Sequence, residues 1–211
     1  MIAAEQENLP TVGSFGPIEE REEELARAGI YRLLGVVLGN PPNQETLRAL
    51  HSLGDGNSPV GKALGSIAIQ AKKTDPDSVS NEYYNLFVGL GEGELVPYGS
   101  YYLAGFLHEK PLARLRSDLQ HLEIEQEGGI AEPEDSISSV CEVMSALVAG
   151  EFGDSAPLEV QKDFFAKHVG SWAGDFFKDL EKAKSAQFYA RVGALGALFM
   201  SIEKQAFAID A

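Results

Sequence analysis

Apolar residues recur at helical spacing along three stretches of the C-terminal half, and this pattern constrains the fold more than any other feature of the chain. Steps of three or four residues place the members of each stretch on one face of a helix. The three stretches are Ile137, Cys141, Met144 and Val148; Phe165, Val169, Trp172, Phe176 and Leu180; and Phe188, Val192, Leu195, Phe199 and Ile202. No alternating run competes with them, so the sequence predicts an all-α helical bundle whose core is built from these faces.

Clusters of proline and glycine predict where the other helices begin and end. An apolar face from Ala28 to Leu38 follows a glutamate-rich start, and further helices are expected over 43–53, 60–73, 75–87 and 107–127. Residues 1–17 are expected to form a flexible tail. The run Gly128–Pro133 is the clearest internal break. It divides one helical domain, residues 18–211, into an N-terminal part (18–127), a hinge (128–135) and a C-terminal part (136–211).

The charge of the chain limits the partners that it can bind. The formal net charge is −15 and the pI is about 4.6. Nucleic acid and anionic membrane surfaces are therefore repelled, whereas a basic partner is attracted. The same acidity also serves solubility alone, so composition leaves both interpretations open.

The start of the chain lacks the basic and apolar regions of a signal peptide. The longest apolar runs anywhere in the chain are shorter than the roughly 20 residues that a membrane-spanning helix needs. The single cysteine, Cys141, has no partner for an internal disulfide, which suits a reducing compartment. We therefore expect a cytoplasmic protein without a membrane span.

Residue types that carry catalysis or hold metals are sparse. No histidine has a glutamate three residues before it, as the di-iron bundles require, and one cysteine excludes an ordinary zinc site. No phosphate-binding glycine loop is present. Asp118 with His121 is interpreted as a surface contact, and Cys141 as a core residue. His168 is interpreted as a histidine at a helix–helix contact, and the alternative is a polar group in a peptide groove. The sequence predicts no catalytic residue, no metal and no cofactor, and it disfavours a helical enzyme or nucleotide-hydrolysing switch.

Aromatic and acidic residues gather in three segments on either side of the internal break: Tyr83–Phe87, Pro97–Tyr102 and Glu132–Asp135. Tyrosine offers apolar area with a polar tip, which suits recognition, and carboxylates pair with arginine in bidentate fashion. The same residues also serve as turn formers and helix caps, with Asp135 or Ser136 as the N-cap of the next helix. Residue types alone leave a binding site and a set of turns equally open.

The order of these segments resembles the TorD/DmsD family of redox-enzyme maturation chaperones, from about Ala26 to Phe207. The matching motifs are Tyr83–Phe87 with Val88 and Gly89; Pro97–Ser100; Glu132–Ser136 with Ile137 and Glu142–Met144; Gln161, Phe164, Phe165, His168 and Trp172; and Phe188 with Tyr189. No single motif is specific, and their order and spacing together carry the resemblance.

The resemblance implies a TorD-like bundle that binds the leader peptide and the apo catalytic subunit of a molybdenum-cofactor oxidoreductase. Such a chaperone assists cofactor insertion and delays twin-arginine export until the enzyme is mature. The implied peptide-binding residues are Tyr83, Leu86, Phe87, Tyr98, Ser100, Tyr102, Glu132, Pro133, Asp135 and Ser136. Ser136 stands where the family has histidine, so this position cannot change its charge with pH.

The acidity of the chain and its aromatic residues also suit a twin-arginine leader as partner. A twin-arginine leader has a basic and an apolar region, and an acidic protein with an aromatic groove complements both. The Gly128-Gly129 pair permits either a monomer or a domain-swapped dimer. The alternative function is an assembly or scaffold subunit that holds a mature segment of a redox enzyme without binding a leader.

Overall fold

The computed structural model describes residues 18–54, 56–125, 132–150 and 155–209, and within these ranges the protein is all-helical, as predicted. The α-helices are α1 (Ile18–Gly39), α2 (Gln44–Leu50), α3 (Pro59–Ala71), α4 (Pro76–Tyr83), α5 (Gly99–Ala104), α6 (Lys110–His121), α7 (Ile137–Ala149), α8 (Leu158–Phe164), α9 (Ala173–Lys182) and α10 (Phe188–Ile209). Two π-helical turns, η1 (Tyr84–Val88) and η2 (Phe165–Val169), continue α4 and α8. The predicted tail at 1–17 and the Gly128-Gly129 pair lie outside the described residues.

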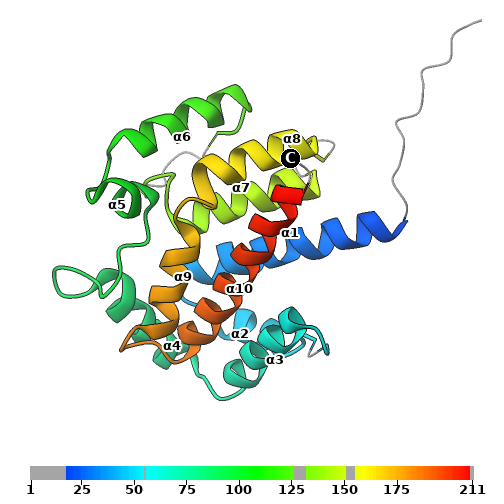
Figure 1. Cartoon of the computed structure of the whole chain (residues 1–211). Coiled ribbons are helices and arrows are strands. Elements are labelled where there is room, and N and C mark those ends of the chain that lie inside the picture. The colour runs from blue at the N-terminus through cyan, green and yellow to red at the C-terminus, as the bar shows by residue number, and fades with distance from the viewer. Residues whose placement is uncertain (1–17, 55, 126–131, 151–154, 210–211) are drawn as a thin grey trace, which may run out of the picture.

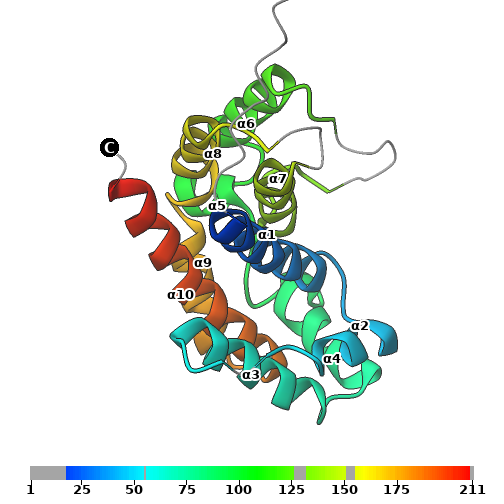
Figure 2. The same cartoon turned by 90° about the vertical axis from the view of Figure 1, so that its right-hand side faces the viewer.

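The helices form two groups that the longer helices join. Helices α2, α3 and α4 lie at one end of the molecule, whereas α5, α6, α7 and α8 lie at the other (Figures 1 and 2). α10 runs between the two groups and packs on α9 and α3, while α1 packs extensively along α7. Helices from the two halves of the sequence therefore pack against each other, α1 against α7 and α3 against α10. None of the helices within the described ranges has the length and apolarity needed to cross a membrane.

Side-chain caps explain where several helices begin. Asn43, Ser58, Asp75 and Ser136 each accept a backbone N–H at the start of α2, α3, α4 and α7. An N-cap of this kind satisfies one of the N–H groups that have no partner inside the helix. The predicted helix starts at Asn43 and at the Asp75-Pro76 pair are thus confirmed.

The helix expected over 107–127 is shorter than predicted, because left-handed residues bound it on both sides. Gly105 ends α5 with φ 82°, and His108 turns the chain with φ 59° before α6 begins at Lys110. α6 ends at His121, and Glu123 then adopts φ 58°. The apolar pattern did not reveal these turns, since left-handed residues other than glycine have only a weak sequence signature.

The apolar faces predicted for the C-terminal half meet in the core, with one exception. Every residue of the first two stretches is buried, and so is every residue of the third except Ile202. Ile202 is 39% exposed, so its prediction as a core residue was wrong. The face of α10 continues instead from Phe199 to Glu203, which is 1% exposed, and then to Phe207.

A buried ion pair explains why a glutamate occupies that core position. Arg27 on α1 donates to both carboxylate oxygens of Glu203, at 2.9 and 2.8 Å, and the Tyr31 hydroxyl donates to the same carboxylate at 3.0 Å. A buried carboxylate needs such partners, because an unpaired one costs several kcal/mol, by rough estimate. The pair ties α1 to α10.

The second stretch does not form one continuous helix. η2 ends at Val169, and α9 starts only at Ala173, so Gly170–Trp172 leave the helical path. Trp172 adopts φ −144°, and its indole Nε1 donates to the carbonyl of His168 at 2.7 Å. This bond satisfies the buried indole N–H and directs the Trp172 ring toward α5.

Close contact between α9 and α10 depends on a glycine. A Cβ atom at Gly193 would lie 2.5 Å from the backbone nitrogen of Glu181 and 2.9 Å from the carbonyl oxygen of Phe177. Since these are backbone atoms, they cannot move without shifting α9. The glycines inside predicted helices were expected to permit close helix packing, and Gly193 does so.

We predict that Gly193→Ala lowers the free energy of unfolding by about 1–3 kcal/mol through overpacking. The matched control is Gly29→Ala in α1, where a Cβ would meet no atom within 4 Å. The free energy of unfolding of this control should rise by up to about 1 kcal/mol, because alanine has a higher helix propensity than glycine. Urea denaturation followed by circular dichroism measures both values, and a stabilised Gly193→Ala variant would contradict the close approach.

Candidate functional site

Two predicted motif segments are joined by a short antiparallel bridge between Tyr98 and Ser136. The Gly99 N–H donates to the Asp135 carbonyl at 2.8 Å, and the Ile137 N–H donates to the Pro97 carbonyl at 2.9 Å. Residues about 40 positions apart in the chain are therefore held side by side. The segment through Tyr98 leads directly into α5, and the segment through Ser136 leads directly into α7.

Side-chain caps fix the same junction. The Ser100 N–H donates to Asp135 Oδ2 at 2.6 Å, so Asp135 supplies acceptors for the first two N–H groups of α5. Ser136 caps α7 by accepting the Ser139 N–H at 3.2 Å. Each of the two neighbouring residues thus caps a different helix, whereas the sequence left open which of them would cap α7.

Six of the ten predicted binding residues line one cleft, of about 300 Å³, which we call the motif cleft. These residues are Tyr83, Phe87, Tyr98, Glu132, Pro133 and Ser136. They come from three separate segments that the fold brings together: the end of α4 with η1, the segment before α5, and the loop before α7. The cleft has aromatic walls and one carboxylate, that of Glu132.

The aromatic wall of the motif cleft is held rigidly. The Tyr83 and Phe87 rings pack edge to face with centroids 4.9 Å apart, and Phe87 packs against Tyr189 at 5.5 Å. The Tyr83 hydroxyl donates to the carbonyls of Leu38 and Gly39 at the end of α1, at 3.2 Å each. Since this hydroxyl is used within the fold, Tyr83 offers mainly its ring face to a ligand.

Burial and nearby charge set the protonation of the polar groups in the cleft. Burial, and then the Glu132 carboxylate, raise the pKa of Tyr83 and of Tyr98 to about 12 each. Both hydroxyls therefore stay protonated near neutral pH. Burial also raises the pKa of Glu132, although hydrogen bonds from Ser136 and Tyr98 oppose this effect. The Tyr98 hydroxyl lies 3.5 Å from Glu132 Oε1.

The other four predicted residues lie outside the motif cleft. Leu86 and Ser100 are fully buried, and Asp135 is 4% exposed beneath the bridge. Tyr102 packs against Trp172 with centroids 5.6 Å apart, and its hydroxyl donates to Asp179 at 3.0 Å. In the free protein these four side chains support the fold around the cleft.

Sequence reasoning did not select five further residues of the cleft: Leu38, Val88, Pro97, Ile137 and Ser138. Val88, Pro97 and Ile137 belong to the matching motifs but were not chosen as binding residues, and Ser138 follows Ile137 directly. Leu38 has no such signal, because it comes from the end of α1 and reaches the cleft only through tertiary packing.

The residue types that line the motif cleft suit recognition. Within the described ranges, no three histidine, cysteine, aspartate or glutamate side chains gather as a metal site would require. Cys141 is fully buried in the core, and burial raises the pKa of its thiol well above the usual range. The arrangement offers aromatic surface for an apolar segment and a partly buried carboxylate for a cation.

Comparisons with known proteins agree on one family. The family model described as nitrate reductase delta subunit matches residues 54–178. The chaperone protein TorD of Shewanella loihica is 25% identical over 212 residues, which cover 90% of this chain and 96% of that protein. A Haemophilus influenzae protein named "Probable Tat proofreading chaperone DmsD" is 28% identical over 120 residues, 56% of each chain.

A solved structure shows the same fold. It is a candidate redox enzyme maturation protein from Archaeoglobus fulgidus, with a TM-score of 0.52 and 20% sequence identity. The match covers 90% of this chain and 99% of that one. The predicted all-helical architecture of TorD type is therefore confirmed.

We predict that Asp135→Ala lowers the free energy of unfolding by about 1–3 kcal/mol, because it leaves the buried Ser100 N–H without an acceptor. Asp135→Asn should cost less, since the amide oxygen still accepts this bond. Thermal and urea denaturation of both variants measure the difference. Equal losses would show that the charge of Asp135, rather than its acceptor oxygen, stabilises the junction.

Proposed function

The chain belongs to the TorD-type family described as nitrate reductase delta subunit, and from this membership we propose that it is a maturation chaperone for a molybdenum-cofactor oxidoreductase. It binds the twin-arginine leader of the apo catalytic subunit in the cytoplasm. By holding the leader it delays export until the cofactor has been inserted. It acts by binding and carries out no catalytic step.

The observation that carries this proposal is the gathering of six motif residues around one cleft. Tyr83, Phe87 and Tyr98 offer aromatic surface, and Pro133 adds apolar surface beside them. An apolar leader segment packs on such walls because burying apolar area contributes about 25 cal/mol per Å². Rigid aromatic residues also lose little conformational entropy when they bind.

Glu132 supplies the polar half of the interaction. Its carboxylate is half-buried beside Tyr98 and Ser136, where solvent screens a charge less than at the open surface. A guanidinium pairs with such a carboxylate in a charge-assisted hydrogen bond. The net charge of −15 adds long-range attraction for the basic region of a leader.

We predict that calorimetric titration with synthetic twin-arginine leaders of molybdoenzymes detects tight binding of one leader. Tyr98→Ala should weaken this binding about tenfold or more, which is the effect of losing one aromatic anchor. Raising the salt from 0.1 M to 1 M should also weaken it, since the screening length falls from about 10 Å to about 3 Å.

The matched control for this titration is Tyr84→Ala. Tyr84 is 43% exposed and does not line the motif cleft, so its removal should leave leader affinity unchanged. Absence of binding to every leader by the folded protein would overturn the proposal. That result would favour an assembly subunit that holds a mature enzyme segment.

We also predict that leader binding weakens as the pH falls, because the arginine pairs only with ionised Glu132. Burial raises the pKa of Glu132, so its charge is lost at a higher pH than the usual value of about 4.3. Among the described residues, Tyr83, Tyr98 and Glu142 are titratable groups beside it. Both tyrosines stay neutral in this range.

Titrations at stepped pH, from about 8 down to about 5, measure this dependence. Glu132→Gln should bind more weakly at high pH and show a flatter profile, because the amide cannot ionise. Tyr98 and Ser136 still contact the amide in this variant. An unchanged pH slope in Glu132→Gln would assign the dependence to another group.

A further inference from the structure

A second and larger cleft lies on the other side of the Tyr98–Ser136 bridge. Its volume is about 760 Å³, and it is lined by residues of α5, α6 and η2; we call it the α6 cleft. Gly99 and Asp135 line the α6 cleft, whereas their neighbours Tyr98 and Ser136 line the motif cleft. The bridge therefore separates two clefts, and the proposed leader site uses only one of them.

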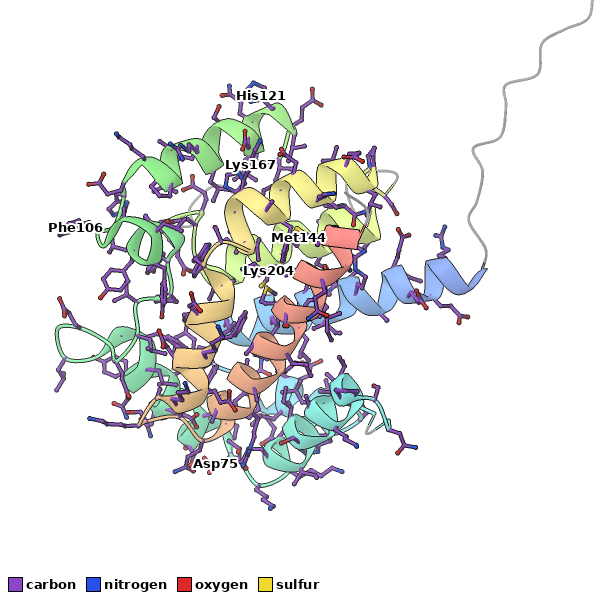
Figure 3. The ribbon with its side chains drawn as sticks, viewed as in Figure 1. Asp75, Phe106, His121, Met144, Lys167 and Lys204 are labelled. Atoms are coloured by element: carbon purple, nitrogen blue, oxygen red, sulfur yellow. The ribbon has the colours of Figure 1, made fainter. Side chains whose placement is uncertain are left out.

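The α6 cleft carries several cations, although the chain as a whole is acidic. Lys110, Arg114 and Lys167 all line it. Figure 3 shows Lys167 between η2 and α6, where it pairs with Asp163 at 2.6 Å and lies 3.8 Å from Asp118. Lys110 and Arg114 are exposed, one turn apart on α6, and neither has an ion-pair partner in the part of the chain that the structure describes.

Asp118 and Asp135, the acidic residues that line this cleft, each have a hydrogen-bond partner within the protein. The sequence suggested a contact between Asp118 and His121. In the structure Asp118 pairs with His168 of η2 instead, and His168 Nε2 lies 2.7 Å from Asp118 Oδ2. Asp135 is used through Oδ2 to cap α5. Lys110 and Arg114 are exposed cations of this cleft, and no carboxylate of the described ranges pairs with either of them.

Apolar surface adjoins these cations. Leu103 lines the cleft and is 45% exposed, with Trp172 and Pro111 forming part of the walls. Phe106 follows at the corner between α5 and α6; it is 70% exposed and projects outward (Figure 3). Large apolar side chains gathered at a surface cleft mark an interaction site more often than a scattered arrangement does.

Two independent features of the cleft resemble those of a binding site. η2, which carries Lys167 and His168, is a π-helical turn, and such turns occur frequently at functional sites. Asp135 Oδ1 and Ser100 Oγ are buried without a hydrogen-bond partner among the described residues. Unsatisfied buried groups are uncommon in folded proteins, and Asp135 lines the α6 cleft.

We propose that the α6 cleft docks a second protein segment, in which an acidic residue adjoins a leucine or phenylalanine. The apolar side chain packs between Leu103 and Trp172, and the carboxylate pairs with Lys110 and Arg114. This chemistry is opposite in charge to that of a twin-arginine leader, so the two clefts take different segments.

The test uses the full chain and a fluorescein-labelled peptide, Gly-Asp-Leu-Phe-Glu-Leu-Gly, in a fluorescence anisotropy titration. The double variant Lys110→Gln/Arg114→Gln should bind this peptide about tenfold more weakly, because two partly exposed ion pairs are lost. The matched control is Arg48→Gln/Lys62→Gln, which removes two exposed cations on α2 and α3 that line neither cleft. This control should bind like the unchanged protein.

Further measurements separate this site from the leader site. The same peptide with asparagine and glutamine in place of its acidic residues should bind about tenfold more weakly, and an unlabelled twin-arginine leader should not displace the acidic peptide. No binding of the acidic peptide, equal binding of the neutral peptide, or displacement by the leader would each overturn the proposal. Failure of every leader to bind would leave it intact, since the acidic peptide is measured alone.

Discussion

The junction between Asp135 and the start of α5 is the constraint on which the functional face of this protein depends. One residue supplies both a backbone and a side-chain acceptor to the first two N–H groups of α5. The next residue, Ser136, caps α7. Because both helices begin at one bridge, their relative position is set by hydrogen bonds rather than by apolar packing alone. Gly99 permits this, since a Cβ there would lie 2.9 Å from Trp172 Nε1.

The bridge also separates two surface clefts that differ in the side chains that line them. The motif cleft carries aromatic rings and the carboxylate of Glu132, whereas the α6 cleft carries Lys110 and Arg114 beside apolar surface. A chain of net charge −15 is expected to attract basic segments over most of its surface. Lys110 and Arg114, which have no ion-pair partner within the described ranges, therefore give this region a preference for acidic segments. Electrostatic complementarity of this kind contributes to specificity more than to affinity.

The candidate site was predicted in part, and the missing part has a physical cause. Tyr98 and Glu132 were selected because their residue types suit recognition and because their motifs resemble a family. Leu86 was selected with them, although it lies in the core. Leu38 was not selected, although it lines the cleft. A motif gives positions along the chain, but the direction of each side chain depends on the helix that carries it and on its neighbours in space.

The sequence alone determined the helical class, most of the core and several helix starts, because helical periodicity and capping are local properties of the chain. It also indicated the family, through the order of its motifs. Tertiary structure decided the rest: that Glu203, rather than Ile202, continues the face of α10, that α6 is short, and that Asp118 meets His168. These outcomes depend on contacts between residues far apart in the chain. Their free energies arise only when the helices pack, so no local pattern records them.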